Sequence, residues 1–72
     1  MKYIKTVGIY EIYEATAEEC RAGYMGMRWS YPCFCAFYKD EEPDERTPRK
    51  IGYSESDFDS LSEAEDWCEV YS

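Results

Sequence analysis

The sequence predicts an α+β fold, in which a small three-stranded antiparallel sheet packs one face on a C-terminal amphipathic helix. Two segments, 3–13 and 29–38, are rich in β-branched and aromatic residues, and a shorter apolar stretch begins at Ile51. The last residues, 61–72, carry apolar side chains at helical spacing. A chain of 72 residues has room for a single domain, 1–72, because a 60-residue domain buries only about 60% of its unfolded surface.

The first segment, 3–13, contains no proline and is predicted as one strand, bent or bulged at Gly8. After it, Thr16 and Glu19 have the spacing of a capping box, in which a hydroxyl and a carboxylate bond each other's backbone N–H groups. This pattern predicts a short connecting helix over about 17–22.

The second segment, 29–38, is apolar or aromatic throughout except at Ser30 and Pro32. Apolar side chains on both faces predict a central strand covered on both sides, or a strand that keeps one face for a partner. Pro32 cannot donate to a strand ladder, so the strand begins, bulges or lies at an edge there.

The segment 40–50 has two prolines, eight charges and no apolar side chain, which predicts a solvated hairpin loop. Its charge runs from acidic to basic. We expect the third strand directly after it, over about 51–54, because this short stretch again contains apolar and aromatic residues.

Ser60 and Glu63 form a second capping-box pattern, which predicts the start of the C-terminal helix. The side chains predicted to face the sheet lie within one arc of the helix: Leu61, Ala64, Trp67, Cys68 and Tyr71. The acids of the helix fall in the opposite sector, which we expect to face solvent.

The charge is distributed unevenly along the chain. Residues 1–50 carry nine acids and eight bases, whereas residues 51–72 carry seven acids and no base. The net charge of −8 repels a phosphate backbone, so we expect no direct binding to nucleic acid. On the helix the acids also repel one another at i,i+3 and i,i+4 spacing, and such breaks of local rules are frequent at functional sites. The alternative interpretation is a solubilising face.

Most enzyme sites are excluded by composition, because the chain has no His, Asn or Gln. The spacing of Asp57 and Asp59 matches the start of a calcium loop, but Leu61 occupies the next ligand position. The glycines form no nucleotide-binding pattern. We therefore expect neither enzymatic activity nor a cofactor.

The four cysteines are Cys20, Cys33, Cys35 and Cys68. The N-terminus resembles no secretory leader and no run of 18 apolar residues occurs, so we expect a cytoplasmic protein without membrane contact. In a reducing compartment the cysteines are expected to be buried free thiols. Their spacing matches no zinc motif, so we expect no metal, with zinc and disulfide as the alternatives.

Two surfaces are candidate binding sites. If 53–59 is extended, its acids project from one side and continue into the helix acids. The predicted partner-binding residues are Glu55, Asp57, Asp59, Glu63, Glu65, Asp66 and Glu69. The alternative site is an aromatic and methionine-rich loop formed by Tyr24, Met25, Met27, Arg28 and Trp29.

The predicted function is that of a small inhibitor or decoy that occupies a basic, nucleic-acid-handling surface of a partner protein. In size, acidity and tyrosine content the chain resembles small phage-encoded inhibitors of bacterial defence systems, including anti-CRISPR proteins and DNA mimics. That resemblance covers no motif. The alternative is a structural or oligomer-forming accessory domain, so both a monomer and a homodimer are considered.

Overall fold

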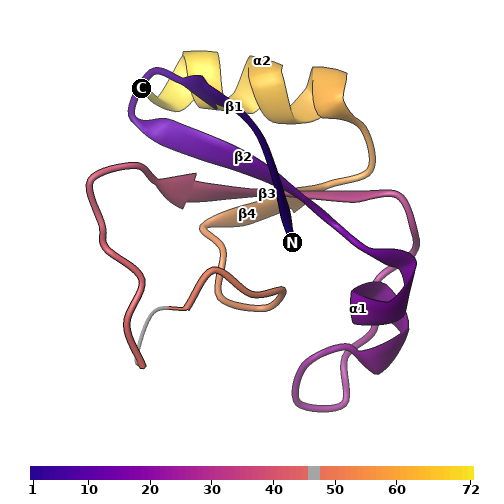
Figure 1. The fold of residues 1–72 in the computed structure, drawn as a ribbon. Helices are drawn as coiled ribbons and strands as arrows, with labels where there is room; N and C mark the ends of the chain where they lie inside the picture. Colours follow the sequence, from indigo (N-terminus) through magenta and orange to yellow (C-terminus); the bar gives the residue numbers. More distant parts are fainter. Residues whose placement is uncertain (46–47) are drawn as a thin grey trace.

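The computed structural model describes residues 1–45 and 48–72 as an antiparallel sheet with a C-terminal helix above it (Figure 1). The elements in chain order are β1 (Lys2–Val7), β2 (Tyr10–Ala15), α1 (Ala17–Ala22), β3 (Cys33–Tyr38), β4 (Ser56–Phe58) and α2 (Leu61–Tyr71). The predicted α+β class and both helices are confirmed. The sheet has four strands rather than three, in the order β1-β2-β3-β4, and all neighbouring strands are antiparallel.

The fourth strand arises because the segment predicted as one strand, 3–13, is a hairpin. Gly8 adopts a φ of +60° at the turn, a conformation that glycine reaches without strain, and the chain reverses so that Val7 pairs with Tyr10. A Cβ at Gly8 would lie 1.8 Å from the Ser72 hydroxyl oxygen, so the end of α2 lies directly against this turn. The expected bend at Gly8 is therefore a complete reversal.

The prediction of a strand over 51–54 is wrong. This segment forms turns, with Tyr53 N–H donating to the Lys50 carbonyl at 3.1 Å and Gly52 at a φ of +92°. Ile51 is only 6% exposed and serves as a core residue rather than a strand residue. The strand follows this segment as β4, where Phe34 pairs with Phe58.

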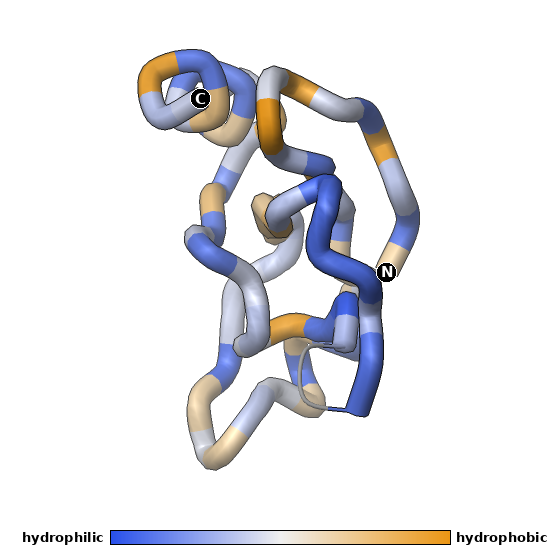
Figure 2. The backbone as a smooth tube through the Cα atoms, turned by 90° about the vertical axis from the view of Figure 1, so that its left-hand side faces the viewer, coloured by the Kyte–Doolittle hydropathy of each residue, from blue (hydrophilic) through white to orange (hydrophobic). Residues whose placement is uncertain are grey.

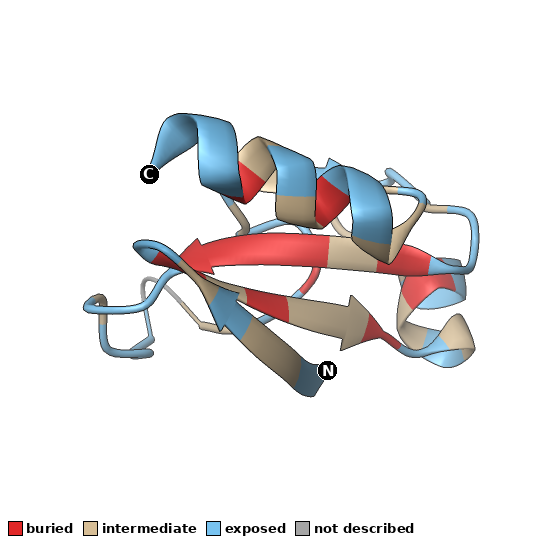
Figure 3. Cartoon of the chain, turned by 90° about the horizontal axis from the view of Figure 1, so that it is seen from above, coloured by how far each residue is buried: buried red, intermediate tan, exposed pale blue. Residues whose placement is uncertain are grey.

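The strand β3 is the centre of the sheet, between β2 and β4. It begins at Cys33, directly after a cis Tyr31–Pro32 peptide bond, so the proline stands outside the ladder. Most of β3 is buried (Figure 3). Both of its faces are covered by residues of this same chain.

The helix α2 covers one face of the sheet, which we call the α2 face. Its core residues are Tyr10, Ile12, Ala36, Ala64 and Cys68. The predicted helix arc is correct for Ala64 and Cys68, both fully buried, but Tyr71 is 60% exposed. The reason is that the Trp67 ring fills the space next to Tyr10, at 4.8 Å between centroids, and Tyr71 packs on Trp67 at the end of the helix.

The opposite face, which we call the thiol face, is covered by separate short segments. Its core residues are Ala15, Cys20, Cys33, Cys35, Phe37 and Ile51. Arg49 closes one end of this face, with its guanidinium carbon 5.0 Å from the centre of the Phe37 ring and an ion pair to Glu11 at 3.3 Å. Arg49 is therefore an exception to the predicted solvated loop over 40–50, of which 46 and 47 lie outside the described residues.

The chain as a whole is polar, although no polar or charged residue is buried among the described residues. The mean hydropathy of the chain is −0.72, and Figure 2 shows strongly apolar residues only in short stretches. Among the described residues, no helix combines the length and apolar character that crossing a bilayer requires.

Candidate functional site

The acids of α2 are held outward by the way the helix begins and docks. Ser60 is the N-cap and accepts a hydrogen bond from the Glu63 N–H at 3.2 Å. The burial of Ala64 and Cys68 then fixes the rotation of the helix. Glu63, Asp66 and Glu69 are exposed as a result, and the last turn of the helix contains no basic residue.

Glu65 differs from the other acids of α2 because it is paired. Its carboxylate lies 2.6 Å from the Lys5 ammonium of β1. This hydrogen bond raises the pKa of Lys5, and the charge of Glu69 adds a smaller effect in the same direction. Glu65 is one of the predicted partner-binding acids, and it also joins α2 to β1 through its ion pair with Lys5.

The acids around β4 do not all point the same way. Phe58 packs on Trp67 of α2, so Asp57, the preceding residue of the strand, points to the thiol face. There the Asp57 carboxylate accepts a hydrogen bond from the Trp29 indole N–H at 2.9 Å and another from the Ser54 hydroxyl. Glu55 and Asp59, on either side of the strand, are exposed.

A pocket brings part of the predicted surface together. It has a volume of about 240 Å³, and its lining includes Asp57, Asp59 and Glu63. The other three helix acids, Glu65, Asp66 and Glu69, lie farther along α2. The seven predicted acids thus divide into three at this pocket, two exposed on the outer side of the helix, Glu65 paired with Lys5, and Glu55 exposed just before β4.

The alternative site begins with a tight turn over Tyr24–Met27, which is followed by Arg28 and Trp29. Tyr24 and Met27 exchange two backbone hydrogen bonds of 2.9 Å, with Met25 at a φ of +49° between them. The turn exposes Met25 by 84% and Met27 by 61%. Arg28 is also exposed.

The two aromatic members of the alternative site are not free surface residues. Tyr24 stacks edge-on against Tyr53 at 4.8 Å, and Trp29 is half-buried against the thiol face. The methionines and Arg28 are therefore the accessible part of this loop.

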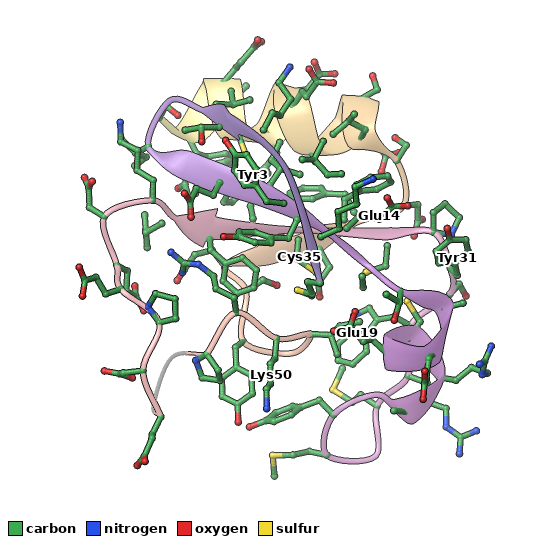
Figure 4. The ribbon with its side chains drawn as sticks, in the orientation of Figure 1. Tyr3, Glu14, Glu19, Tyr31, Cys35 and Lys50 are labelled. Carbon is green, nitrogen blue, oxygen red and sulfur yellow. The ribbon has the colours of Figure 1, made fainter. Side chains whose placement is uncertain are left out.

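Sequence reasoning missed a cluster formed by three of the four cysteines. Cys33 and Cys35 point to the same side of β3, and Asp57 pairs with Cys35 across the β3–β4 ladder. Figure 4 shows Cys35 near the middle of the sheet, on the side away from α2. Cys20 reaches Cys33 from α1, whereas Cys68 lies on the α2 face. All four cysteines are buried free thiols.

The pKa values of the thiols in this cluster are raised above the ordinary value of cysteine. Burial, with a contribution from the charge of Asp57, raises the pKa of Cys33 to about 11. Burial and the neighbouring Cys33 raise the pKa of Cys35 further, and Asp57 acts in the same direction. The only sequence signal for this cluster was the alternation of Cys33 and Cys35, which places both on one face of a strand.

No family model matches the chain, and comparison with curated proteins and with solved structures also found no match.

Proposed function

We propose that this protein is a small acidic binding module that occupies a basic surface of a partner protein, in the manner of an inhibitor or decoy of a nucleic-acid-handling complex. The observation that carries the proposal is the lack of internal charge compensation on α2. Within residues 1–45 and 48–72, the only ion pair made by an acid of α2 is that of Glu65 with Lys5. Glu63, Asp66 and Glu69 are exposed without such a partner.

The cost of this arrangement supports a binding role. Asp66 lies three residues from Glu63 and from Glu69, and each like-charge pair on a helix costs about 0.2–0.5 kcal/mol. The later acids also face the negative end of the helix dipole. A basic partner would relieve this repulsion and would be attracted over a long range.

The test begins with the partner. The immobilised protein is incubated with a lysate of the source cells, the bound proteins are identified by mass spectrometry, and the most enriched one is purified. The double variant Asp66→Lys, Glu69→Lys is then compared with the parent. Glu65 is left in place because it pairs with Lys5. Lysines near the end of a helix also favour the fold.

The matched control is the double variant Glu42→Lys, Glu45→Lys, which changes the net charge equally within an exposed loop. We expect the α2 variant to weaken binding by about tenfold or more, and the loop control to weaken it much less. Binding of the parent should weaken as salt rises and should be competed by DNA. Equal affinities of the folded α2 variant and the parent would refute the proposal.

The exposed turn around Met25 and Met27 is the second candidate surface. The observation that favours it is the exposure of two flexible apolar side chains, which are common at adaptable binding surfaces. Binding through this turn would be insensitive to salt and would be lost in the double variant Met25→Ser, Met27→Ser. The same affinity measurements therefore distinguish the two surfaces.

A further inference from the structure

The thiol face contains a group of metal-binding atoms that no part of the proposed function uses. The sulfur atoms of Cys33 and Cys35 and a carboxylate oxygen of Asp57 all lie within 4.8 Å of one another. The topology of the sheet produces this group, because Cys33 and Cys35 alternate on one face of β3 and Asp57 is the cross-strand neighbour of Cys35.

A third sulfur lies beside this group and is the candidate fourth ligand. The thiol of Cys20, on α1, interacts with the thiol of Cys33, although it stands outside the group whose ligand atoms all lie within 4.8 Å of one another. Bonds of about 2.3 Å to zinc in a tetrahedral site place neighbouring sulfur atoms roughly 3.8 Å apart. The sulfur atoms of Cys33 and Cys35 and the Asp57 oxygen would each need to move by no more than about 1 Å to reach a comparable spacing.

The Asp57 carboxylate is already oriented by its surroundings. The Trp29 indole N–H donates to one oxygen at 2.9 Å, and the Ser54 hydroxyl donates to the other. Carboxylates that bind metals are usually held by such outer hydrogen bonds, which fix the direction of the ligand. Each oxygen keeps a lone pair for a metal.

The cysteines of the cluster are buried, whereas Asp57 is exposed and opens the cluster to solvent. The pocket of about 240 Å³ next to it is lined by Cys33 and Asp57 of the cluster, and its wall also contains Asp59 and Glu63. Among the described residues, none with a basic side chain lines this pocket. Its negative charge would concentrate cations at the entrance to the cluster.

We propose that Cys20, Cys33, Cys35 and Asp57 bind one zinc-class divalent cation on the thiol face. Thiolates select zinc over magnesium and calcium, which prefer sites made of oxygen ligands alone. As each sulfur–metal bond forms, the thiol releases its proton to solvent, so the metal competes with protons at the cluster. The expectation of no metal rested on the spacing of the cysteines along the chain. The pairing of β3 with β4 brings Asp57 next to Cys35, although the two residues are far apart in sequence.

The test uses Co²⁺ as a spectroscopic substitute for zinc, added to the full chain with its thiols kept reduced. Tetrahedral cobalt bound to sulfur has characteristic visible bands and a sulfur-to-cobalt charge-transfer absorption. We expect these to saturate at one Co²⁺ per chain and to disappear when one equivalent of Zn²⁺ is added. Absence of these bands would overturn the proposal.

Two matched pairs of variants identify the ligands. Asp57→Asn should weaken cobalt affinity by about tenfold or more, whereas Asp66→Asn, on the exposed side of α2, should not change it. Cys33→Ala should weaken cobalt affinity and lower the charge-transfer absorption per bound Co²⁺, whereas Cys68→Ala removes an equally buried thiol from the α2 face and should change neither. Circular dichroism establishes that each variant is folded.

The remaining ligand is tested by Cys20→Ala, which should also weaken cobalt affinity by about tenfold or more. Unchanged affinity in this variant would overturn the four-ligand set. Unchanged affinity in Asp57→Asn, which preserves the shape of the side chain, would overturn the site itself, as would equal losses in Cys33→Ala and Cys68→Ala. None of these outcomes depends on the acidic surface of α2, so they are independent of the proposed function.

Discussion

The two faces of the sheet are closed in different ways. The α2 face is covered by one regular helix of 11 residues, whose buried Ala64 and Cys68 pack against β2 and β3. Within the described residues, the thiol face is closed instead by side chains from several segments, among them Cys20 of the short helix α1, Trp29 and Ile51. From this difference we expect the α2 face to supply more of the stability, and the thiol face to be the one that binds a metal, as proposed above.

The largest expected effect concerns the α2 face. Trp67 contacts the rings of Tyr10, Phe58 and Tyr71, with centroid distances of 4.8, 5.6 and 4.9 Å. Because Trp67 is half-buried, we expect Trp67→Ala to lower the free energy of unfolding by about 3 kcal/mol, the low end of the range for buried aromatic residues. Urea denaturation followed by circular dichroism measures this change.

The control for that prediction is Tyr71→Ala, which removes a neighbouring ring that is 60% exposed and should cost less than about 1 kcal/mol. Equal losses in the two variants would mean that α2 is not docked through Trp67. The stability of the α2 face would then not come from the docked helix, and the expected difference between the two faces would be wrong.

The next effect concerns the thiol face. Trp29→Phe keeps an aromatic side chain at this position but removes the indole N–H that holds Asp57. We expect cobalt affinity to fall by about tenfold, as for other outer hydrogen-bond partners of metal ligands. The free energy of unfolding without metal should change by less than half of the Trp67→Ala effect. A cobalt titration and a urea denaturation, made on the same variant, measure both quantities.

If Trp29→Phe instead destabilises the fold while leaving the cobalt affinity unchanged, Trp29 is only a packing residue. The distinction matters because both interpretations account equally well for its half-buried position.

The smallest effect concerns the N-terminal cover of the thiol face. Burial alone would raise the pKa of Glu19, but hydrogen bonds from Thr16 and from the N-terminal ammonium lower it on balance. The distances are 2.9 Å to the Thr16 N–H and 3.1 Å to the ammonium. A carboxylate with a lowered pKa stabilises the fold above its unfolded pKa of about 4.3, and this stabilisation is lost as the pH falls through the folded value.

We therefore expect Glu19→Gln to lower the melting temperature slightly at pH 7, with a loss of less than about 1 kcal/mol because the carboxylate is largely solvent-screened. The difference from the parent should shrink as the pH falls below about 4. Melting curves at several pH values provide the measurement. A difference that grows toward low pH would contradict the assigned role of Glu19.

The contrast between the faces also explains which features could be predicted from sequence. Helical periodicity and capping patterns depend on neighbours within a few residues, so α1, α2 and the rotation of α2 through Ala64 and Cys68 were predictable. The hairpin at Gly8 was missed because a bulge and a full reversal have the same local signal. Whether the chain turns back is decided by the partner strand.

The thiol face was the least predictable part, because its contacts join residues far apart in sequence. Arg49 lies in a highly charged segment, and only the fold places its side chain on Phe37. The cluster of Cys33, Cys35 and Asp57 depends on the register of β3 with β4, and β4 lies after the segment where a strand was expected. Spacing along the chain contains no information on that register.

The most direct test of the proposed difference between the faces asks whether the folded thiol face binds a metal. The measurement is thermal unfolding of the reduced wild-type protein without added metal, with one equivalent of Zn²⁺, and with Mg²⁺ as the control cation. A cation that binds only the folded chain stabilises it by about 2.7 kcal/mol when its free concentration is 100 times its Kd. We expect Zn²⁺ to raise the melting temperature by several degrees and Mg²⁺ to leave it unchanged. Identical melting temperatures in all three samples would show that the thiol face is only a second, weaker core.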